Sequence, residues 1–420
     1  MNRNGISQAL GLIHPITLIR GRNAEVWDDQ GNRYIDFVGG IGVLNFGHCH
    51  PHIIKAVTEQ ATQLTHYAFN AAEHRPYKQL MDALSRFIPM TGNLAGMLTN
   101  SGAEATENAL KVARIKTGRT GVIAFDGGFH GRTLAAVNLN GKVTPYKNGL
   151  GPLPGPVYHL PYPSPDNNVS AETAMQALDR LIQVEVDVQN IAAVIVEPVL
   201  GEGGFQLLDQ TFAQELRLFC DRYGIILIFD EIQSGFGRTG QPFAFSLLNV
   251  EPDLLLLGKS IAGGLPLGAV FGKAELMNYP AVGSLGGTYS GNPIACAAAL
   301  ATLDIMHSDN TWQSAAAYTA TLEERYRLWK KRDISPWLGN ITGTGAMRGL
   351  ELHHETLGAG TALMPHILKK ARENGLLLMP SGKYRNIIRL LTPLTIEPEI
   401  LNEGLDILEQ VLSETADFTA

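Results

Sequence analysis

Short apolar runs, each closed by a polar or glycine-containing turn, recur through the middle of this chain and limit the folds it can adopt. Longer segments with helical periodicity separate them. The runs are GVIAF at 121–125, IAAVIV at 191–196, IILIF at 225–229, DLLLL at 253–257 and GAVFG at 268–272. Runs that do not alternate apolar with polar residues are typical of strands buried on both faces, which helical crossovers join in parallel. We therefore predict a mostly parallel α/β domain over residues 51–305.

The two chain ends predict a different architecture. Residues 20–38 contain two strand-like pieces on either side of a turn at 29–32, as in a β-hairpin. The C-terminal part combines long helical segments, at 312–331 and 362–374, with strand candidates at 345–352 and 386–394. We expect residues 1–50 and 306–420 to form one small α+β domain from both chain ends.

Charge and cysteine content exclude several classes of protein. The chain of 420 residues carries 33 basic and 40 acidic residues, a net charge of −7, which gives no basic surface for nucleic acid or an anionic membrane. Its cysteines, Cys49, Cys220 and Cys296, are odd in number and widely spaced, which favours a reducing compartment without disulfides. No signal peptide or membrane-spanning run is evident. We expect a soluble, cytoplasmic protein whose partners are small molecules or further copies of itself.

Polar side chains follow two of the predicted strands at the point where each ends. Asp230 comes directly after 225–229, and Lys259 follows Gly258 after four leucines. Ligands of parallel sheets bind outside the carboxyl ends of the strands. A buried carboxylate there needs a cationic or hydrogen-bonding partner, and a buried lysine has a lowered pKa that makes its amine nucleophilic. A structural ion pair for Asp230 and a solvent-reaching amine for Lys259 are the simpler alternatives.

A phosphate site is predicted away from Lys259. Gly258-Lys259-Ser260 matches the end of a nucleotide-binding loop, but Asp253 stands where that loop needs its first glycine. The segment 101–104, Ser-Gly-Ala-Glu, opens a predicted helix instead, where free N–H groups and the helix dipole favour an anion. An ordinary serine cap is the alternative. Phosphate anchoring, a buried carboxylate and an activated lysine together are what pyridoxal phosphate chemistry requires.

The chain resembles the class III aminotransferases, the ω-amino acid group of fold-type-I pyridoxal phosphate enzymes, and within them the bacterial 4-aminobutyrate aminotransferases. The resemblance rests on GGIGVLNFGHCHP, TNSGAEATENALKVAR, GGFHGRT, EPVLGEGGF, FDEIQSGFGRTG, GKSIAGGLPLG, GGTYSGNP and IIRLLTPLTI, in the order of the family. It implies a large domain with a mostly parallel seven-stranded sheet and a small α+β domain built from both chain ends.

The resemblance also implies roles for the residues that hold and use the cofactor. Lys259 would form the Schiff base with pyridoxal 5′-phosphate and then transfer a proton, and Asp230 would pair with the pyridinium nitrogen. Phe129 and Ile232 would pack on the two faces of the ring, and Gln233 would reach the phenolic oxygen.

The phosphate would be shared between two subunits. Ser101, Gly102 and Ala103 would hold it from one subunit and Thr288 would join them from the other. The resemblance therefore implies a homodimer, or a dimer of dimers, with shared active sites.

Four further residues would bind the substrate. Arg132 and Arg389 resemble the two arginines of the family that bind carboxylates, and Ile41 resembles the 4-aminobutyrate type. Glu202 would pair with Arg389 while a monocarboxylate is bound and would release it for a dicarboxylate. The resulting prediction is an enzyme that moves the amino group of 4-aminobutyrate to 2-oxoglutarate, giving succinate semialdehyde and glutamate.

Alternatives to this donor remain open. Leu200 and Ser290 stand where the family commonly has glutamine and alanine. Transamination of 5-aminovalerate, ornithine or acetylornithine, a racemase or an aminomutase would use the same fold, and a non-catalytic nucleotide protein is the alternative from another class. No metal site is expected: the cluster at 48–50 falls in a glycine-histidine turn of the family, and 353–355 lacks the histidine spacing of a zinc helix.

Overall fold

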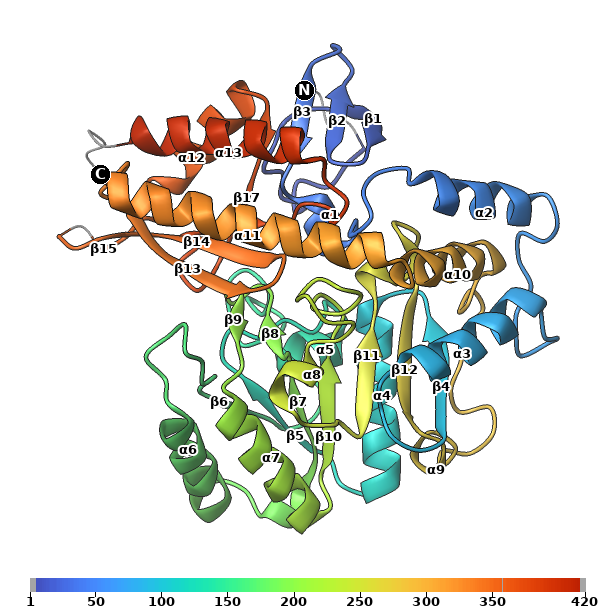
Figure 1. The fold of residues 1–420 in the computed structure, drawn as a ribbon. Helices are drawn as coiled ribbons and strands as arrows, with labels where there is room; N and C mark the ends of the chain where they lie inside the picture. The colour runs from blue at the N-terminus through green and yellow to red at the C-terminus, as the bar shows by residue number, and fades with distance from the viewer. Residues whose placement is uncertain (1–4, 357, 416–420) are drawn as a thin grey trace.

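A central sheet organises the computed structural model, which describes residues 5–356 and 358–415 (Figure 1). Its strand order is β4-β12-β11-β10-β7-β5-β6. β12 pairs antiparallel with both of its neighbours, and the other pairings of the sheet are parallel, so the predicted mostly parallel seven-stranded sheet is confirmed. The strands are β4 (Leu94–Thr99), β5 (Gly121–Phe125), β6 (Val157–Leu160), β7 (Ile191–Val196), β10 (Ile226–Asp230), β11 (Leu254–Leu257) and β12 (Gly268–Lys273).

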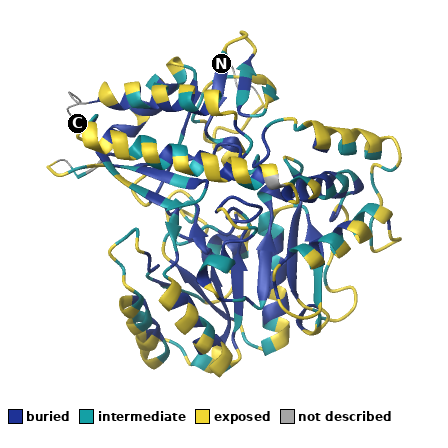
Figure 2. Cartoon of the chain, in the orientation of Figure 1, coloured by how far each residue is buried: buried dark blue, intermediate teal, exposed yellow. Residues whose placement is uncertain are grey.

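Helices cover both faces of this sheet, which explains why its strands are continuous apolar runs. Every residue of β5, β7 and β11 is buried, and Figure 2 shows the sheet as the interior of the lower part of the molecule. One face packs on α4 (Gly102–Thr117), α5 (Leu134–Leu139) and α9 (Ala274–Met277). The other packs on α3 (Arg75–Phe87), α6 (Ala171–Val184), α7 (Gln210–Tyr223) and α10 (Pro293–Met306).

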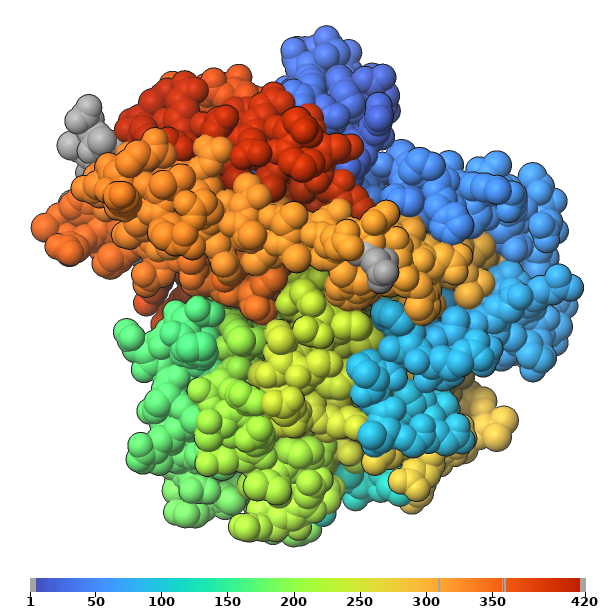
Figure 3. All heavy atoms as spheres, viewed as in Figure 1, coloured from blue at the N-terminus to red at the C-terminus, as the bar shows by residue number. Residues whose placement is uncertain are grey.

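The two chain ends meet above the central sheet. β3 pairs in parallel with β16, so the N-terminal hairpin joins a C-terminal strand. Figure 3 shows N-terminal residues in blue beside C-terminal residues in red at the top of the molecule. A second sheet, in the order β13-β14-β18-β17 with β15 on β14, lies in the same part. The strands are β1 (Leu18–Arg22), β2 (Glu25–Asp28), β3 (Arg33–Asp36), β13 (Leu338–Thr344), β14 (Met347–His354), β15 (Gly358–Ala359), β16 (Leu376–Leu377), β17 (Met379–Ser381) and β18 (Ile387–Leu390).

Helices α11 (Asp309–Arg332), α12 (Met364–Glu373) and α13 (Pro398–Ser413) complete this upper part. Their buried side chains share one hydrophobic cluster with Ile35 and Phe37 from the N-terminal hairpin. The domain bounds 1–50, 51–305 and 306–420 stay predictions, and residues 1–4, 357 and 416–420 lie outside the described part. The remaining short elements are α1 (Gly39–Gly42), α2 (Pro51–Ala61), η1 (Val188–Asn190), β8 (Val199–Leu200), β9 (Gln206–Leu207), α8 (Phe245–Leu248) and η2 (Lys259–Ala262). Across the described residues, we find no helix with the length and apolarity that a membrane span requires.

Glu231, the residue after β10, gives a pH-dependent contribution to stability. Its side chain is fully buried and accepts hydrogen bonds from the Phe245 N–H at 2.7 Å and the Ser234 hydroxyl at 2.6 Å. Burial raises the pKa of Glu231 to about 7. The folded protein therefore binds a proton that the unfolded chain releases near its ordinary pKa, so this contribution is full at low pH and is lost as the pH rises through about 7.

Glu231→Gln should remove that dependence, because its amide can donate to Ser234 and accept from Phe245 in the same geometry. Relative to wild type, we expect the variant to gain about 3 kcal/mol of stability between about pH 5 and about pH 8.5. Thermal unfolding midpoints of both proteins across this range measure it. Parallel pH profiles would show that Glu231 is ionised in the folded protein.

Candidate active site

The carboxyl ends of β4, β5, β7, β10 and β11 lie at one edge of the central sheet, and the predicted catalytic residues lie there. Asp230 is the last residue of β10 and is 3% exposed. β11 is the parallel neighbour of β10, with Asp230 opposite Leu256, and Lys259 follows two residues after β11 ends. The structure therefore brings Asp230 and Lys259 to the ends of adjacent strands, as their order in the sequence predicts.

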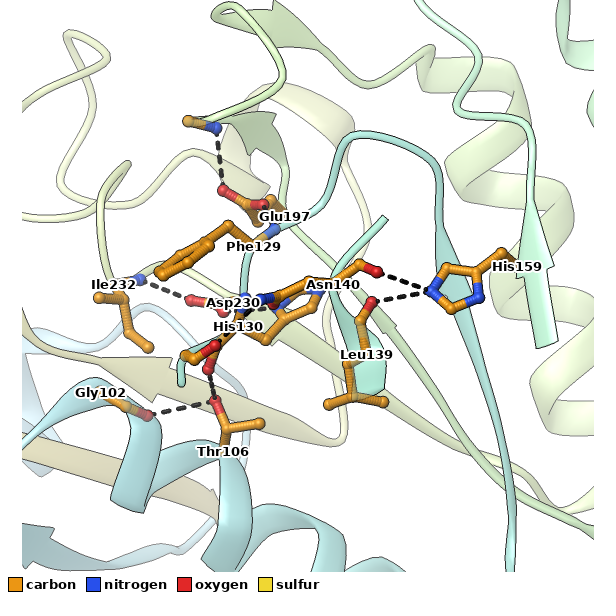
Figure 4. Close-up of polar contacts among 12 residues, drawn as sticks. Gly102, Thr106, Phe129, His130, Leu139, Asn140, His159, Glu197, Asp230 and Ile232 are labelled. Atoms are coloured by element: carbon orange, nitrogen blue, oxygen red, sulfur yellow. Dashed lines mark hydrogen bonds and ion pairs between the residues drawn. The ribbon is translucent and has the colours of Figure 1, made fainter. Parts of the chain in front are cut away.

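Asp230 is held by a histidine that sequence reasoning missed. The Nδ1 atom of His130 lies 2.7 Å from Asp230 Oδ2, and Asp230 Oδ1 accepts a hydrogen bond from the Ile232 N–H at 3.1 Å (Figure 4). Burial alone would lower the pKa of His130, but the hydrogen bond and charge of Asp230 outweigh burial and raise it. His130 thus fixes the position of the Asp230 side chain, which faces the site where a positively charged nitrogen could pair with it.

The backbone of His130 is fixed on two further sides. Its N–H donates to Asn140 Oδ1 at 2.7 Å, and its carbonyl accepts from the Thr106 hydroxyl at 3.0 Å (Figure 4). Thr106 belongs to α4, so the segment after β5 is tied to the helix that opens at Gly102. The position of Asp230 thus depends on contacts with residues about a hundred positions earlier in the chain.

Lys259 lies in a strained backbone position with a destabilised charge. Its φ angle is 46°, in the left-handed region that residues other than glycine rarely adopt. Burial lowers the pKa of Lys259, and the charges of Glu197, Asp230 and Glu202 partly oppose the shift. The consequence is a larger population of neutral amine, the form that attacks a carbonyl carbon.

The first turn of α4 forms a cup that can take an anion. Ser101 is the N-cap, and its hydroxyl oxygen accepts from the Glu104 N–H at 3.2 Å. A Cβ atom on Gly102 would lie 2.7 Å from Ile232 Cδ1, so a larger residue there would push the Ile232 side chain away. Ala103 follows in the same first turn, where backbone N–H groups have no intrahelical acceptor. The predicted phosphate-binding residues therefore lie next to the side chain predicted to pack on the cofactor ring.

Phe129 and Gln233 border the same space. The Phe129 N–H donates to Glu197 Oε1 at 2.8 Å, and Figure 4 shows Phe129, Asp230 and Ile232 close together. Gln233 donates through Nε2 to the Ile41 carbonyl at 3.2 Å, whereas its buried Oε1 has no partner among the described residues. That oxygen can accept a hydrogen bond from a bound hydroxyl group.

The predicted carboxylate-binding arginines differ in exposure. Arg389, in β18, is 1% exposed and pairs through Nη2 with Glu202 Oε2 at 2.7 Å; its Nη1 has no partner among the described residues. Burial opposes ionisation of Glu202, but the charge and hydrogen bond of Arg389 outweigh it and lower the pKa of Glu202. Arg132 is exposed, and its guanidinium lies 5.3 Å from the ring centre of Tyr146.

Two predicted residues lie at exposed positions. Ile41, with a φ of 64°, is 37% exposed and reaches Gln233 through its carbonyl group. Thr288 is exposed in the loop between α9 and α10, and its part in the site of a second subunit stays a prediction.

Sequence reasoning gave no role to His130 and Tyr146, and it noted Glu197 at the end of an apolar run without assigning it a role. Glu197 follows β7 and is buried, with its carboxylate bonded to the N–H groups of Phe129 and Gly201 at 2.8 and 2.9 Å. Its position after an apolar run is the same signal that identified Asp230. No pattern in the sequence marks His130 or Tyr146, because both reach the site from segments of irregular structure.

These residues fit pyridoxal phosphate. The start of α4 at Gly102 suits a phosphate, Asp230 with His130 suits a pyridinium nitrogen, and the unpartnered Oε1 of Gln233 suits the phenolic hydroxyl. Lys259 supplies an amine for the aldehyde. Among the described residues, no group of three or more histidine, cysteine or acidic side chains is arranged to hold a metal ion.

Comparisons with known proteins agree with this fit. The family model described as aminotransferase class-III matches residues 8–412. The 2-aminoadipate transaminase of Pseudomonas putida is 62% identical over 414 residues, covering 99% of this chain and 100% of that protein. The 4-aminobutyrate aminotransferase GabT of Escherichia coli is 43% identical, covering 97% and 96%. A structure of the Toxoplasma gondii ornithine aminotransferase, whose active site is described as partly occupied by PLP, matches with a TM-score of 0.83 and 30% identity, covering 96% of this chain and 91% of that one.

Proposed function

The chain belongs to the class III aminotransferases, and we propose that it moves the amino group of 2-aminoadipate to 2-oxoglutarate, giving 2-oxoadipate and glutamate. It is a pyridoxal 5′-phosphate enzyme of fold type I. The observation that best supports this reaction is that Asp230 and Lys259 lie at the ends of the adjacent strands β10 and β11. The 62% identity to a 2-aminoadipate transaminase supports the donor.

The cofactor supplies, when bound, a carbonyl group that accepts the amino group and a ring that withdraws electrons from the reacting carbon. Ser101, Gly102 and Ala103 would hold its phosphate at the first turn of α4. Asp230, fixed by His130, would pair with the ring nitrogen. Phe129 and Ile232 would pack against the ring.

Lys259 is the residue that handles the proton. Its Nζ atom is the amine that would bond to the aldehyde of the bound cofactor, and once free it would be available as a base. The released Nζ can then remove the proton from the amine-bearing carbon, because its lowered pKa keeps it neutral more often than an exposed lysine. The negative charges of Glu197, Asp230 and Glu202 nearby let the same nitrogen accept that proton.

Arg132 and Arg389 bind the two carboxylates of the substrate in this proposal. Arginine presents a planar fork that matches a carboxylate, and the unpartnered Nη1 of Arg389 is available for one. Glu202 occupies Nη2 of Arg389 and has to move before an α-carboxylate can take both nitrogens. Arg132, exposed beside Tyr146, would bind the distal carboxylate.

4-Aminobutyrate is the second candidate donor, and the closed Glu202–Arg389 pair favours it. A donor without an α-carboxylate leaves Arg389 without a partner unless Glu202 stays bound to it, and an unpaired buried charge is costly. The distance of 2.7 Å between Glu202 Oε2 and Arg389 Nη2 supports this candidate, since such a donor needs Glu202 to stay paired with Arg389. The identity of 43% to a 4-aminobutyrate aminotransferase supports this candidate less strongly than the 62% match supports 2-aminoadipate.

Four amino acids form a matched set that separates the two candidates. Glutamate differs from 4-aminobutyrate, and 2-aminoadipate from 5-aminovalerate, only by an α-carboxylate on the amine-bearing carbon. Each ratio of kcat/KM within such a pair therefore measures what Arg389 and Glu202 contribute. The kcat/KM ratio of 2-aminoadipate to glutamate, and that of 5-aminovalerate to 4-aminobutyrate, measure the effect of one additional methylene group between the amine-bearing carbon and the distal carboxylate.

We expect 2-aminoadipate to show the highest kcat/KM of the four in the donor half-reaction, measured without an acceptor because glutamate with 2-oxoglutarate gives no net change. Single-turnover loss of the cofactor absorption band on mixing the holoenzyme with each amine measures the donor half-reaction alone. If 4-aminobutyrate exceeds 2-aminoadipate, the second candidate is correct. If none of the four reacts, both donors are wrong.

Glu202→Ala should change the ratios within the matched pairs. With a donor that lacks an α-carboxylate, Arg389 is left without a partner in this variant. A donor that has an α-carboxylate neutralises Arg389 itself. The preference for the α-carboxylate should therefore rise by at least about tenfold in both pairs. The half-reaction of the cofactor amine form with 2-oxoglutarate should be retained. An equal loss with all four donors would show that Glu202 is not a gate.

A further inference from the structure

Tyr146 touches three residues that the mechanism uses separately. It lies in the segment between α5 and β6, and its hydroxyl is 3.4 Å from Glu202 Oε2. Its ring centre lies 5.1 Å from that of Phe129, at an interplanar angle of 57°. The guanidinium carbon of Arg132 lies 5.3 Å from the centre of the same ring. One side chain thus connects a ring-confining residue with the residues proposed to bind both carboxylates.

The hydroxyl of Tyr146 donates to a carboxylate that already has a cationic partner. Burial raises the pKa of Tyr146, and the charge of Glu202 raises it further, so the phenol keeps its proton. Glu202 Oε2 accepts from both Tyr146 and Arg389 Nη2. At 3.4 Å the hydrogen bond from Tyr146 is long, so we expect it to stabilise the Glu202–Arg389 pair only modestly.

The segment that carries Tyr146 is anchored next to Glu202. The Lys142 Nζ donates to the Gly382 carbonyl at 3.3 Å, and the Gly382 N–H donates to the Glu202 carbonyl at 3.0 Å. Lys147 donates to the Asn138 carbonyl at 2.9 Å on the other side of Tyr146. These contacts hold the tyrosine against the backbone that presents Glu202, so its hydroxyl acts at a fixed place.

We propose that Tyr146 determines specificity by retaining Glu202 on Arg389. This rests on the proposed function, in which Glu202 must leave Arg389 before an α-carboxylate can bind. A hydrogen bond to Glu202 Oε2 stabilises the closed pair and so favours amines that lack an α-carboxylate. The aromatic ring of Tyr146 also packs against the guanidinium of Arg132 and so restricts where the distal carboxylate can bind.

Tyr146→Phe isolates the hydroxyl, because phenylalanine keeps the ring against Phe129 and Arg132. We expect the kcat/KM ratio of glutamate to 4-aminobutyrate to rise about threefold to tenfold, as removal of one such bond allows. The ratio of 2-aminoadipate to 5-aminovalerate should rise by the same factor. The ratio of 2-aminoadipate to glutamate should stay unchanged, since both carry the α-carboxylate. Tyr279→Phe, at a surface tyrosine that is 53% exposed, is the matched control and should alter no ratio.

The double variant Tyr146→Phe, Glu202→Ala shows whether the hydroxyl acts through Glu202. In the Glu202→Ala background, Tyr146→Phe should leave both pair ratios unchanged. The same rise in both backgrounds would mean that the hydroxyl contacts the substrate directly, and no rise in either would mean that it does not govern the pair; each result overturns the proposal. Failure of Glu202→Ala itself to alter the ratios would instead refute the gate in the proposed function.

Discussion

Lys259→Ala is expected to lower kcat/KM by at least about a thousandfold with every donor, because the variant loses both the nucleophile and the group that transfers the proton. The absorption band of the covalently bound cofactor should disappear, while the cofactor itself can still bind at the phosphate cup. Lys273→Ala is the matched control, since Lys273 is an exposed lysine at the far end of β12. Spectra and single-turnover kinetics of the three proteins measure the difference.

Two results would contradict this role of Lys259. An unchanged band in Lys259→Ala would place the covalent link on another lysine. Activity within about tenfold of wild type would mean that another group transfers the proton.

Asp230→Asn is expected to cause the second largest loss, of about a hundredfold to a thousandfold in kcat. Asparagine has the same shape but no charge, so it cannot keep the ring nitrogen of the cofactor positively charged. The effect should appear mainly in kcat and in the position of the cofactor band, because the phosphate cup and Lys259 are untouched.

Asp221→Asn provides the control for this substitution, since Asp221 is an exposed carboxylate that pairs with Arg217 near the opposite edge of the sheet. It should have wild-type kinetics. An unshifted band and near-normal kcat in Asp230→Asn would show that the carboxylate does not act on the ring nitrogen.

The residues at strand ends could be predicted from the sequence because the pattern itself places them. Asp230 and Lys259 each follow a continuous apolar run, and the carboxyl ends of parallel strands share one edge. The start of α4 was predictable for a similar reason, since serine and glycine before a periodic segment identify a helix N-terminus. These inferences need only the order of elements along the chain.

The direction of β12 did not follow from its composition. GAVFG has the apolar continuity of a parallel strand, but β12 runs antiparallel between β4 and β11. The connection of ten residues between Leu257 and Gly268 is short for a helical crossover, which is the physical reason for the reversal.

Contacts between distant segments could not be read from the sequence either. His130 meets Asp230 across a hundred positions, and Tyr146 reaches Glu202 across 56. Both residues lie in irregular segments that lack the periodicity from which side-chain direction is inferred. The donor depends on such contacts, which explains why the motifs predicted an aminotransferase but named 4-aminobutyrate as the donor and did not include 2-aminoadipate among the alternatives.

Borohydride reduction of the purified enzyme, followed by peptide mapping, tests the central claim most directly. Reduction fixes the cofactor to the nitrogen that bears it, and mass spectrometry of the digest then locates that nitrogen. The cofactor should be found on Lys259, in the peptide that follows the leucines of β11. When the amino donor is added before reduction, Lys259 should no longer be labelled. Labelling of a different lysine, or no labelling of a protein that retains its activity, would contradict the account.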